Sequence, residues 1–489
     1  MEEFVDSVEN QTFPLHPVDT QSAFLNIPTQ FFFPNKTDDA DFMPGKVLRH
    51  GFYKALARFP IMAGHLQADG KGGTQVVVDR NNLNMPEYLE STSDIEYETM
   101  KKKNFHWSAW PEGLATVGGI TTAHAKEGVI KLANVHITRM KNNSGVVVFL
   151  NVPHYVVDGV GFFEFVSLWG EMCRNGHSEH QFCFDRSIIA DSIPNERRPL
   201  NSATEQMYGG FSPLADWLAW LSPITRGWVL SKAQLSAGVS SSTFRVSRTK
   251  IDDLRAQVAA ELPESERDKL TNAGVLAGLV SMMAAHAHRA CDAERQPGLI
   301  ASAVSSVWAA LRSLVATKEA ESRPVLMLGD LRMGLSLEKR NYTGNVLMPF
   351  NTPCPVAVLE APITPESIAT TARIVTAIYS SIDPPLIGSF VDMITRNPRC
   401  FTRPMMYVDA NPKIVTIVNE LHFNIYSADF GYGYPEWACA VPSFFANFIA
   451  IMPSPPPGDD IVVNIIMKTD VLDKIVANEF WQSIATLIY

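Results

Sequence analysis

The stretch from residue 145 to residue 169 constrains the fold of this chain most strongly, because its hydrophobic period changes within a few residues. Gly145–Leu150 is a short apolar, β-branched run typical of a buried strand, which should end near Pro153. Beyond it, large apolar side chains recur at helical spacing: Phe162, Phe163, Phe165, Val166 and Trp169. The sequence therefore predicts a buried strand that turns directly into a helix.

The turn between this strand and helix carries His154 and Asp158. A histidine at a strand's exit can accept a proton from an alcohol near neutral pH, because its unperturbed pKa is about 6.5. Asp158 either orients His154 directly or faces away and holds the turn, for which Gly159 and Gly161 should supply backbone freedom. A lone His-x-x-x-Asp pattern is weak evidence, because a chain with 12 histidines and many carboxylates contains it by chance.

A second motif, Asp429–Pro435, contains two glycines, Gly431 and Gly433, where a backbone bends or approaches a ligand closely. By itself it is compatible with an ordinary turn. It is neither a phosphate loop nor a dinucleotide fingerprint, since no third glycine follows at the required spacing.

Taken together, the two motifs resemble the BAHD acyltransferase superfamily, whose members move acyl groups from coenzyme A thioesters to alcohols or amines. Further matches follow the order of the family's elements over nearly the whole chain. They are Pro14–Asp19 with Phe31–Phe33, Leu56–Leu66, Lys269–Leu276, and Asp330–Arg332 followed by Tyr342–Asn345.

The resemblance implies an α/β (α+β) fold of two chloramphenicol-acetyltransferase-like domains, each a mixed β-sheet flanked by helices, with the active site in a channel between them. A length of 489 residues agrees, because single cores stop growing at about 250–300 residues. We expect an N-terminal domain at 1–200, a crossover at 201–243 and a C-terminal domain at 244–489. A strand near 419–438 could be shared with the first domain. The polar, proline-bearing segment Ile193–Ser202 marks the boundary.

The crossover contains Gly210–Trp228, which is too rich in Trp and Leu for a free linker. The alternative is an interfacial helix that rests on lipid, because Trp suits the edge of an apolar face at a headgroup boundary. Packing within the crossover accounts for the same residues and is the preferred interpretation.

For the chemistry, the resemblance implies direct transfer in a ternary complex, with His154 as the general base and no acyl-enzyme. It also implies that Asp158 points away from the reaction centre and pairs with Arg332, and that Gly159 and Asn345 have structural roles. The donor is an acyl-CoA, expected to be acetyl-CoA, which is a co-substrate and not a bound cofactor. The acceptor is expected to be a hydroxyl of a small lipophilic or secondary-metabolite molecule, and the protein a monomer.

Residues that face coenzyme A are also implied by the resemblance. Asp429 and its glycines are expected to shape the coenzyme A channel without touching the acyl carbon. The set predicted to bind the co-substrate is Lys269, Thr271, Asp429, Gly431, Tyr432 and Gly433.

Departures from the plant pattern favour the fungal branch of the superfamily, since Tyr432 replaces the usual Trp and His65 the usual Arg. Plant members often carry Thr-x-Trp about ten residues before Asp-Phe-Gly, and its Trp helps to hold the oxyanion. Here these positions are Val418, Asn419 and Glu420. Ionised Glu420 cannot donate a hydrogen bond, so the side-chain amide of Asn419 is predicted to stabilise the oxyanion. The phenol of Tyr432 is the second candidate.

Composition excludes several other functions. A net charge of −10 argues against nucleic acid as a partner, because phosphate backbones require a basic surface. Six scattered cysteines without a C-x-x-C pattern indicate reduced thiols. The sequence has neither the H-E-x-x-H motif of a zinc site nor the Gly-x-Ser-x-Gly motif of a serine nucleophile, so we infer neither a catalytic metal nor a serine hydrolase. Neither a secretory signal nor an apolar stretch of about 18 residues is present, so we expect no transmembrane segment and a cytoplasmic location.

Two alternatives remain open. A condensation-type domain shares the His-x-x-x-Asp-Gly site but takes carrier-protein thioesters, and the Asp-Phe-Gly-Tyr-Gly motif argues against it. A catalytically inactive binding protein of the same fold is the other alternative, and intact His154 argues against that.

Overall fold

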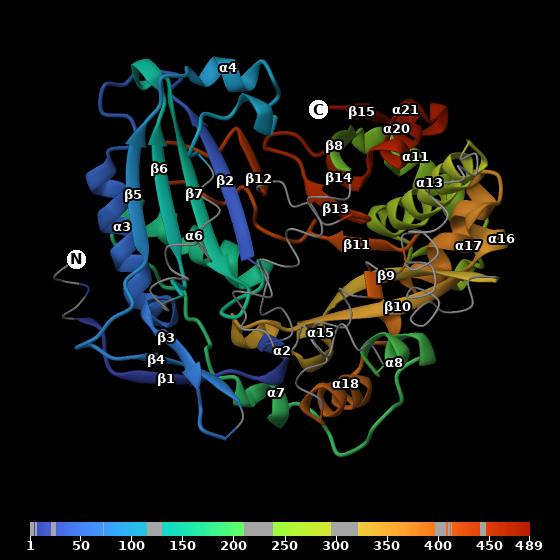
Figure 1. Ribbon diagram of the computed structural model, residues 1–489, viewed down its shortest axis with the longest axis horizontal. Helices are drawn as coiled ribbons and strands as arrows, with labels where there is room; N and C mark the ends of the chain where they lie inside the picture. Colours follow the sequence, from blue (N-terminus) through green and yellow to red (C-terminus); the bar gives the residue numbers. More distant parts are fainter. Residues whose placement is uncertain are drawn as a thin grey trace, which may run out of the picture.

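Two large β-sheets lie side by side in the computed structural model, each with helices packed against it (Figure 1). The described residues are 4, 7–20, 26–71, 73–114, 130–209, 238–294, 321–396, 407–408, 411, 413–440 and 446–489. Of the crossover expected at 201–243, residues 210–237 lie outside this set. The structure is a mixed α/β fold, as the sequence predicted.

The first sheet has the strand order β12-β2-β7-β6-β5. Its central strand, β7 (Gly145–Pro153), is buried along its whole length, because strands cover both of its edges and its side chains are almost all apolar. The predicted buried strand is confirmed. The other members are β12 (Trp437–Ala440), β2 (Asn26–Pro34), β6 (Asn134–Arg139) and β5 (Glu87–Thr92).

Helix α6 (Gly159–Asn175) follows β7 after a short turn and packs against α3 (Gly45–Arg58). All five apolar residues that predicted this helix are buried. At the crossing, the rings of Phe52 and Trp169 meet edge to face, with their centroids 5.3 Å apart. The strand and helix that hold the candidate catalytic turn are therefore fixed by a common core.

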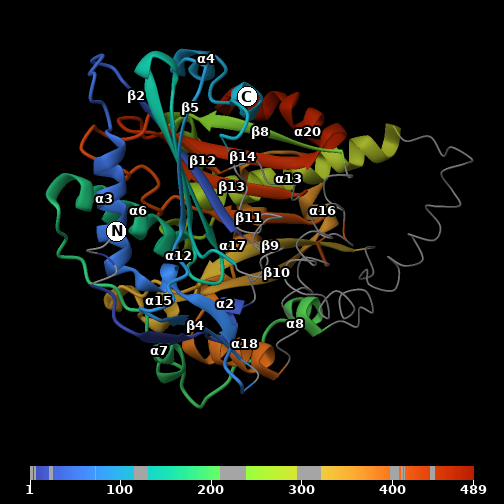
Figure 2. The same ribbon diagram turned by 60° about the vertical axis from the view of Figure 1, so that its left-hand side comes forward.

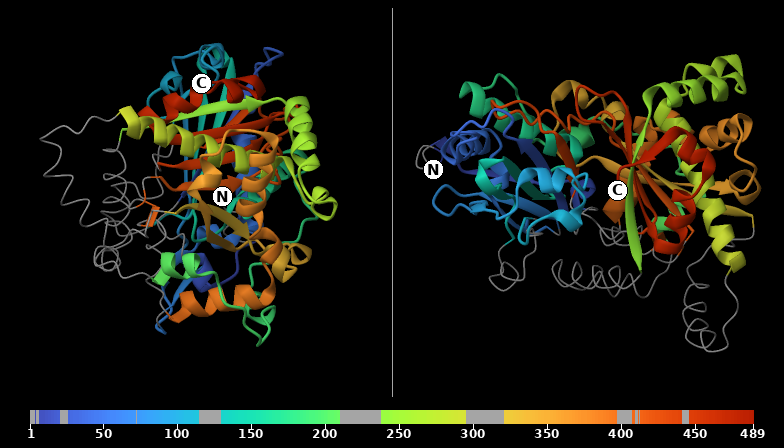
Figure 3. Two further views of the ribbon diagram at one scale, coloured as in Figure 1. Left: turned by 90° about the vertical axis from the view of Figure 1, so that its right-hand side faces the viewer. Right: turned by 90° about the horizontal axis from the view of Figure 1, so that it is seen from above.

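The second sheet has the order β10-β9-β11-β13-β14-β8-β15. Seen from above, helices α11, α13, α17 and α20 lie on the side of this sheet that faces away from the first half (Figure 3). The strands are β8 (Val239–Val246), β9 (Ser322–Asp330), β10 (Leu347–Pro355), β11 (Val415–Asn419), β13 (Phe448–Pro453), β14 (Ile461–Lys468) and β15 (Ala485–Leu487). The helices are α11 (Arg248–Ala260), α13 (Asn272–Glu294), α17 (Pro365–Thr376) and α20 (Thr469–Val476).

Strand β12 joins the first sheet although the strands on either side of it in the sequence belong to the second sheet. It pairs antiparallel with β2, so that Trp437 lies opposite Phe32, and Figure 2 shows the orange-red strand next to the blue one. We propose on this basis that the chain divides into domains near residue 200 and that the C-terminal half lends β12 to the N-terminal domain.

A third core lies where the two halves meet below the sheets, and it includes Val18, Ile189, Leu331, Tyr342 and Ile387. It gathers α2 (Pro17–Thr20), α7 (Ser187–Asp191), α8 (Ser202–Gly209), α15 (Arg332–Leu335) and α18 (Pro384–Arg396). The small sheet β1-β4-β3 flanks the first half, with strands at Gln11–Pro14, Thr74–Val78 and His65–Ala68.

Short elements complete the described chain. They are α4 (Tyr97–Lys101), α12 (Glu264–Arg267), α16 (Val356–Leu359), α21 (Glu479–Ile484), and the 3-10 turns Pro60–Ala63, Trp107–Ala109, Lys141–Asn143, Glu338–Arg340 and Tyr379–Ser381. Among the described residues no single helix is long and apolar enough to cross a membrane. Segments 365–381 and 384–396 reach that length only as a pair, bent by 84°.

Candidate active site

The turn after β7 places His154 at the strand's exit and makes Asp158 the N-cap of α6. The Asp158 carboxylate accepts a hydrogen bond from the backbone N–H of Gly161 (3.3 Å), which is one of the unpaired donors of the helix's first turn. The predicted order of strand, histidine, aspartate and helix is thus a single rigid unit.

Asp158 forms a bidentate ion pair with Arg332, which lies 174 residues away in sequence. Both bonds are 2.7 Å long, and the two side chains are only 1% and 4% exposed. The backbone N–H of Val346 also donates to Asp158 (3.2 Å). A buried pair of this kind is stable only when its remaining hydrogen-bonding positions are filled, as they are here.

The N–H groups of the Arg332 guanidinium make further hydrogen bonds. They donate to the backbone carbonyls of Tyr342 (3.2 Å) and Gly344 (2.9 Å) and to the carboxylate of Asp330 (3.2 Å). The Asp-x-Arg and Tyr-x-Gly-Asn elements therefore meet at one guanidinium, which ties the second half of the chain to the catalytic turn.

No hydrogen bond joins Asp158 to His154 among the described residues, because both carboxylate oxygens are directed to Arg332 and backbone N–H groups. Burial lowers the pKa of His154, and the negative charge of Asp158 opposes this shift through space. The imidazole is therefore neutral at neutral pH and able to accept a proton. Of the two roles considered for Asp158, the geometry agrees with holding the turn.

Asn345 is the side chain that contacts His154. Its Nδ2 donates to the His154 carbonyl (3.0 Å) and lies 3.3 Å from Nδ1, while its Oδ1 accepts from the Leu347 N–H (3.4 Å). No hydrogen bond to Nε2 of His154 occurs among the described residues, and we propose this nitrogen as the base.

Gly159 and Gly161 are required for a different reason from the one the sequence suggested. A Cβ on Gly159 would lie 2.3 Å from the ring of Phe423, and one on Gly161 would lie 2.3 Å from the carbonyl oxygen of Thr343. Neither glycine has a positive φ. The expectation that they free the backbone was wrong, because close packing of the second half against α6 is what excludes a side chain.

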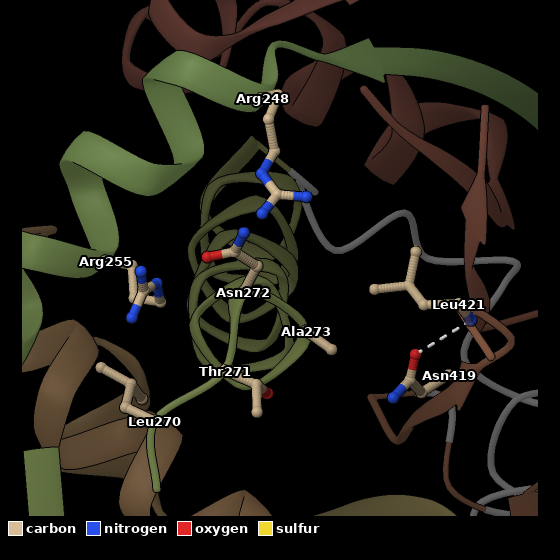
Figure 4. Close-up of a pocket in the computed structure, with 8 residues that line it drawn as sticks. All are labelled: Arg248, Arg255, Leu270, Thr271, Asn272, Ala273, Asn419 and Leu421. Atoms are coloured by element: carbon tan, nitrogen blue, oxygen red, sulfur yellow. Dashed lines mark hydrogen bonds between the residues drawn. The ribbon is translucent and has the colours of Figure 1, made fainter. Parts of the chain in front are cut away.

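A cavity of about 380 Å³ opens between α11, the start of α13 and the end of β11 (Figure 4). Figure 4 views α13 along its axis. Arg248 and Arg255 of α11 lie above and to the left of this helix, and Asn419 and Leu421 lie to its right. The lining residues are Arg248, Arg255, Leu270, Thr271, Asn272, Ala273, Asn419 and Leu421.

The cavity favours an anion. Thr271 caps α13 by accepting from the Gly274 N–H (3.0 Å), and the positive end of this 23-residue helix faces the cavity. Arg248 pairs with Asp252 (2.8 Å), whereas Arg255 makes no ion pair within the described part of the chain. Of the residues predicted to bind the co-substrate, Thr271 lines the cavity and Lys269 is exposed two residues before it.

Asn419 also lines the cavity, where its Oδ1 accepts from the Leu421 N–H (3.2 Å) and its Nδ2 is left to donate. No hydrogen bond connects Asn419 with His154 in the described structure. Burial raises the pKa of the neighbouring Glu420 to about 7. The sequence argument took Glu420 as ionised, whereas a carboxyl group with this pKa is partly protonated at neutral pH.

The Asp429 motif folds back on itself. Asp429 accepts from the N–H groups of Gly431 (2.8 Å) and Gly433 (3.1 Å), whose φ values of 100° and 90° require glycine. Its carbonyl accepts from Arg174 of α6, and the Tyr432 ring packs edge-on against Phe42. None of Asp429, Gly431, Tyr432 or Gly433 lines the cavity of Figure 4.

Sequence reasoning missed several residues of this region. Arg248 and Arg255 are seven residues apart, which places them two turns apart on one face of a helix, and this spacing was a usable signal. Asp19, described below, ends the family-like segment Pro14–Asp19 but received no role there, and Arg186 carried no such signal. No cluster of three or more metal-ligating side chains occurs among the described residues.

Comparison with known proteins identifies the class. The chain belongs to the Transferase family, whose model matches residues 6–480, and the predicted BAHD-type acyltransferase is confirmed.

Solved structures share its fold. The structure of F. graminearum TRI101 complexed with coenzyme A and T-2 mycotoxin is 14% identical, covers 98% of this chain and 100% of that one, and has a TM-score of 0.71. Vinorine synthase is 16% identical over 98% and 97% of the two chains, with a TM-score of 0.59. Akuammiline synthase 1 of Alstonia scholaris is 35% identical over 65 residues, which is 13% of this chain and 15% of that relative's length.

Proposed function

We propose that this protein transfers an acyl group, expected to be acetyl, from acyl-CoA to a hydroxyl of a small lipophilic acceptor, with His154 as the general base. One observation carries the proposal. The imidazole of His154 lies at the exit of β7, beside the buried Asp158–Arg332 pair; Asn345 holds the backbone carbonyl of His154, and no hydrogen bond to Nε2 occurs among the described residues. The backbone of the base is thus preorganised before any substrate binds.

The reaction follows from this geometry. Nε2 of His154 takes the proton of the acceptor hydroxyl while the oxygen attacks the thioester carbonyl carbon. The tetrahedral intermediate then collapses, the carbon–sulfur bond breaks, and the departing thiolate takes the proton from the imidazolium. General base catalysis of this kind contributes roughly 100- to 10,000-fold.

The cavity between α11 and α13 is proposed to bind the phosphates of coenzyme A. Two guanidinium groups and the capped N-terminus of α13 provide local positive charge on a chain whose net charge is −10. We place Thr271 in this site and Lys269 at its rim. Asp429 and its glycines are then proposed to support α6 from outside the cavity, since Arg174 and Phe42 are their partners.

Asn419 is proposed to hydrogen-bond the oxyanion. Its Oδ1 accepts from the Leu421 N–H, and its Nδ2 donates to no group among the described residues. Glu420 does not oppose this role, since burial favours its uncharged form and thus reduces repulsion of the developing negative charge.

The test is to incubate the purified protein with acetyl-CoA and a mixture of alcohols and to follow the release of free thiol. Acceptor-dependent release that is lost in His154→Ala supports the proposal. No release with acetyl-CoA but transfer from a carrier-protein thioester would indicate the condensation-type alternative. Neither reaction, with retained binding of coenzyme A, would indicate an inactive binding protein. We propose that the protein acts as a monomer, as the family resemblance implies.

A further inference from the structure

A second buried ion pair contacts the catalytic turn. Asp19 of α2 and Arg186, just before α7, approach to 3.6 Å, with side chains that are 0% and 3% exposed. Neither residue belongs to the two principal motifs. Two charges so deeply buried are costly to keep unless each has further partners, and the partners here lead to His154.

Arg186 binds the catalytic turn directly. Its guanidinium donates to the backbone carbonyls of Val156 (2.8 Å) and Phe184 (2.9 Å). Val156 lies midway between His154 and Asp158 in the sequence, so Arg186 holds the turn at a point that Arg332 does not bind. The planar fork of arginine can reach two carbonyls at once, which a lysine cannot do.

Asp19 acts on the same turn through Asn345. Its Oδ1 accepts from the Asn345 N–H (3.0 Å) and its Oδ2 from the His16 N–H (2.9 Å). Asn345 in turn donates to the carbonyl of His154 (3.0 Å). One carboxylate therefore anchors both the guanidinium that holds Val156 and the amide that holds His154.

The two ion pairs are joined by a shared aromatic ring. Tyr342 is 1% exposed, and its ring centroid lies 5.7 Å from the guanidinium carbon of Arg186 and 6.0 Å from that of Arg332. Both distances fall within the range of cation–π attraction. The N-terminal segment, the catalytic turn and the Tyr342–Asn345 element therefore form one continuous network.

We infer that Asp19 and Arg186 are positioning residues for acyl transfer, which set the backbone of the catalytic turn and thereby the direction of the His154 imidazole. This inference rests on the proposed role of His154 as base. The network touches neither the cavity of Figure 4 nor its arginines, so disturbing it should change turnover and leave binding of acetyl-CoA intact.

The experiment compares Arg186→Lys, Asp19→Asn and Asn345→Ala, measured below the melting temperature of each variant and normalised to folded protein. Arg186→Lys keeps the charge next to Asp19 but loses one of the two carbonyl bonds. We expect each variant to lower kcat by roughly 10- to 100-fold, because a displacement of about 1 Å at a reacting group has effects of this size. The KM for acetyl-CoA should stay within about twofold of wild type.

The matched control is Arg323→Lys. Arg323 forms a largely buried ion pair with Glu360 (2.5 Å) that has no contact with the turn, so this variant should lower the melting temperature with kcat unchanged. If Arg186→Lys does not fold, Asp19→Asn, which keeps the shape of the side chain, carries the test.

A kcat within about twofold of wild type in the folded variants would overturn the inference. If His154→Ala is inactive in the same assay, the failure concerns positioning alone. If His154→Ala is also active, the proposed base itself is wrong.

Discussion

The catalytic turn and the cavity between α11 and α13 are built in opposite ways. At the turn, residues 154–158 are held by buried groups from three distant segments of the chain, and Asp158 and Arg332 make several bonds each. At the cavity, adjoining elements contribute partly exposed side chains, and Arg255 makes no ion pair in the described structure. The backbone of the catalytic turn is therefore held in place before substrate binds, whereas the cavity retains an arginine whose charge can pair with an anionic ligand.

This difference has energetic consequences. Removal of one partner from a buried ion pair costs about 3–5 kcal/mol, because the other charge is left uncompensated. A partly exposed pair such as Arg248–Asp252 contributes about 0–1 kcal/mol, because water and salt screen it. Substitutions at the turn should therefore reduce stability and turnover, while those of the cavity arginines should weaken binding alone.

The largest expected effect is on stability. Asp158→Ala leaves Arg332 buried without its main partner and removes the N-cap of α6, so the free energy of unfolding should fall by about 3–5 kcal/mol. Chemical denaturation with a linear extrapolation measures this. Asp252→Ala at the cavity is the matched control and should change stability by less than about 1 kcal/mol. Equal losses in the two variants would remove the contrast between the regions.

His154→Ala should lower kcat by at least about 100-fold with little change in stability or in binding of coenzyme A. The pH profile of the wild type gives a second readout. Burial lowers the pKa of His154, so the neutral base persists below pH 6.5, and activity should be lost only as pH falls through that lowered pKa. An acid limb of kcat/KM centred above pH 6.5 would contradict a buried imidazole as the base.

The turn and the cavity also differ in how far the sequence predicts them. A continuous apolar, β-branched run predicts β7 and helical spacing predicts α6, and His154, Asp158, Arg332 and Asn345 all lie on short motifs. The pairing of β12 with β2, the role of Gly161 and the pKa of Glu420 depend on which distant segments pack together. Local patterns carry no information about such contacts, so the surroundings of the motifs had to come from the structure.

Asn419 tests whether the cavity wall also takes part in the chemistry. If its Nδ2 holds the oxyanion, Asn419→Ala should remove about 2.7–4 kcal/mol of transition-state stabilisation. The variant should then show a lower kcat with a smaller change in KM. Glu420→Gln is the matched variant, because it keeps the shape and removes the titration near pH 7. It should retain kcat at neutral pH. A larger loss in Glu420→Gln than in Asn419→Ala would transfer the donor role to Glu420.

The smallest expected effect concerns Arg255, and it decides whether the cavity binds the phosphates of coenzyme A. Arg255→Ala should raise the KM for acetyl-CoA by roughly tenfold at low ionic strength, which corresponds to about 1.4 kcal/mol, and leave kcat unchanged. The effect should shrink as salt is added, because a partly exposed charge is screened over about 10 Å at 0.1 M.

Lys250→Ala is the matched control, because it removes the same charge from the same helix. Lys250 donates to the Ser483 carbonyl and does not line the cavity, so the KM of this variant should match that of the wild type. Equal KM values for the two variants would mean that net charge attracts the co-substrate and that the cavity is not its site. A higher KM in Arg255→Ala alone, with an unaltered kcat, would instead show that the cavity contributes to binding of the co-substrate and not to the chemical step. The contrast between the partly exposed cavity and the buried turn requires this result.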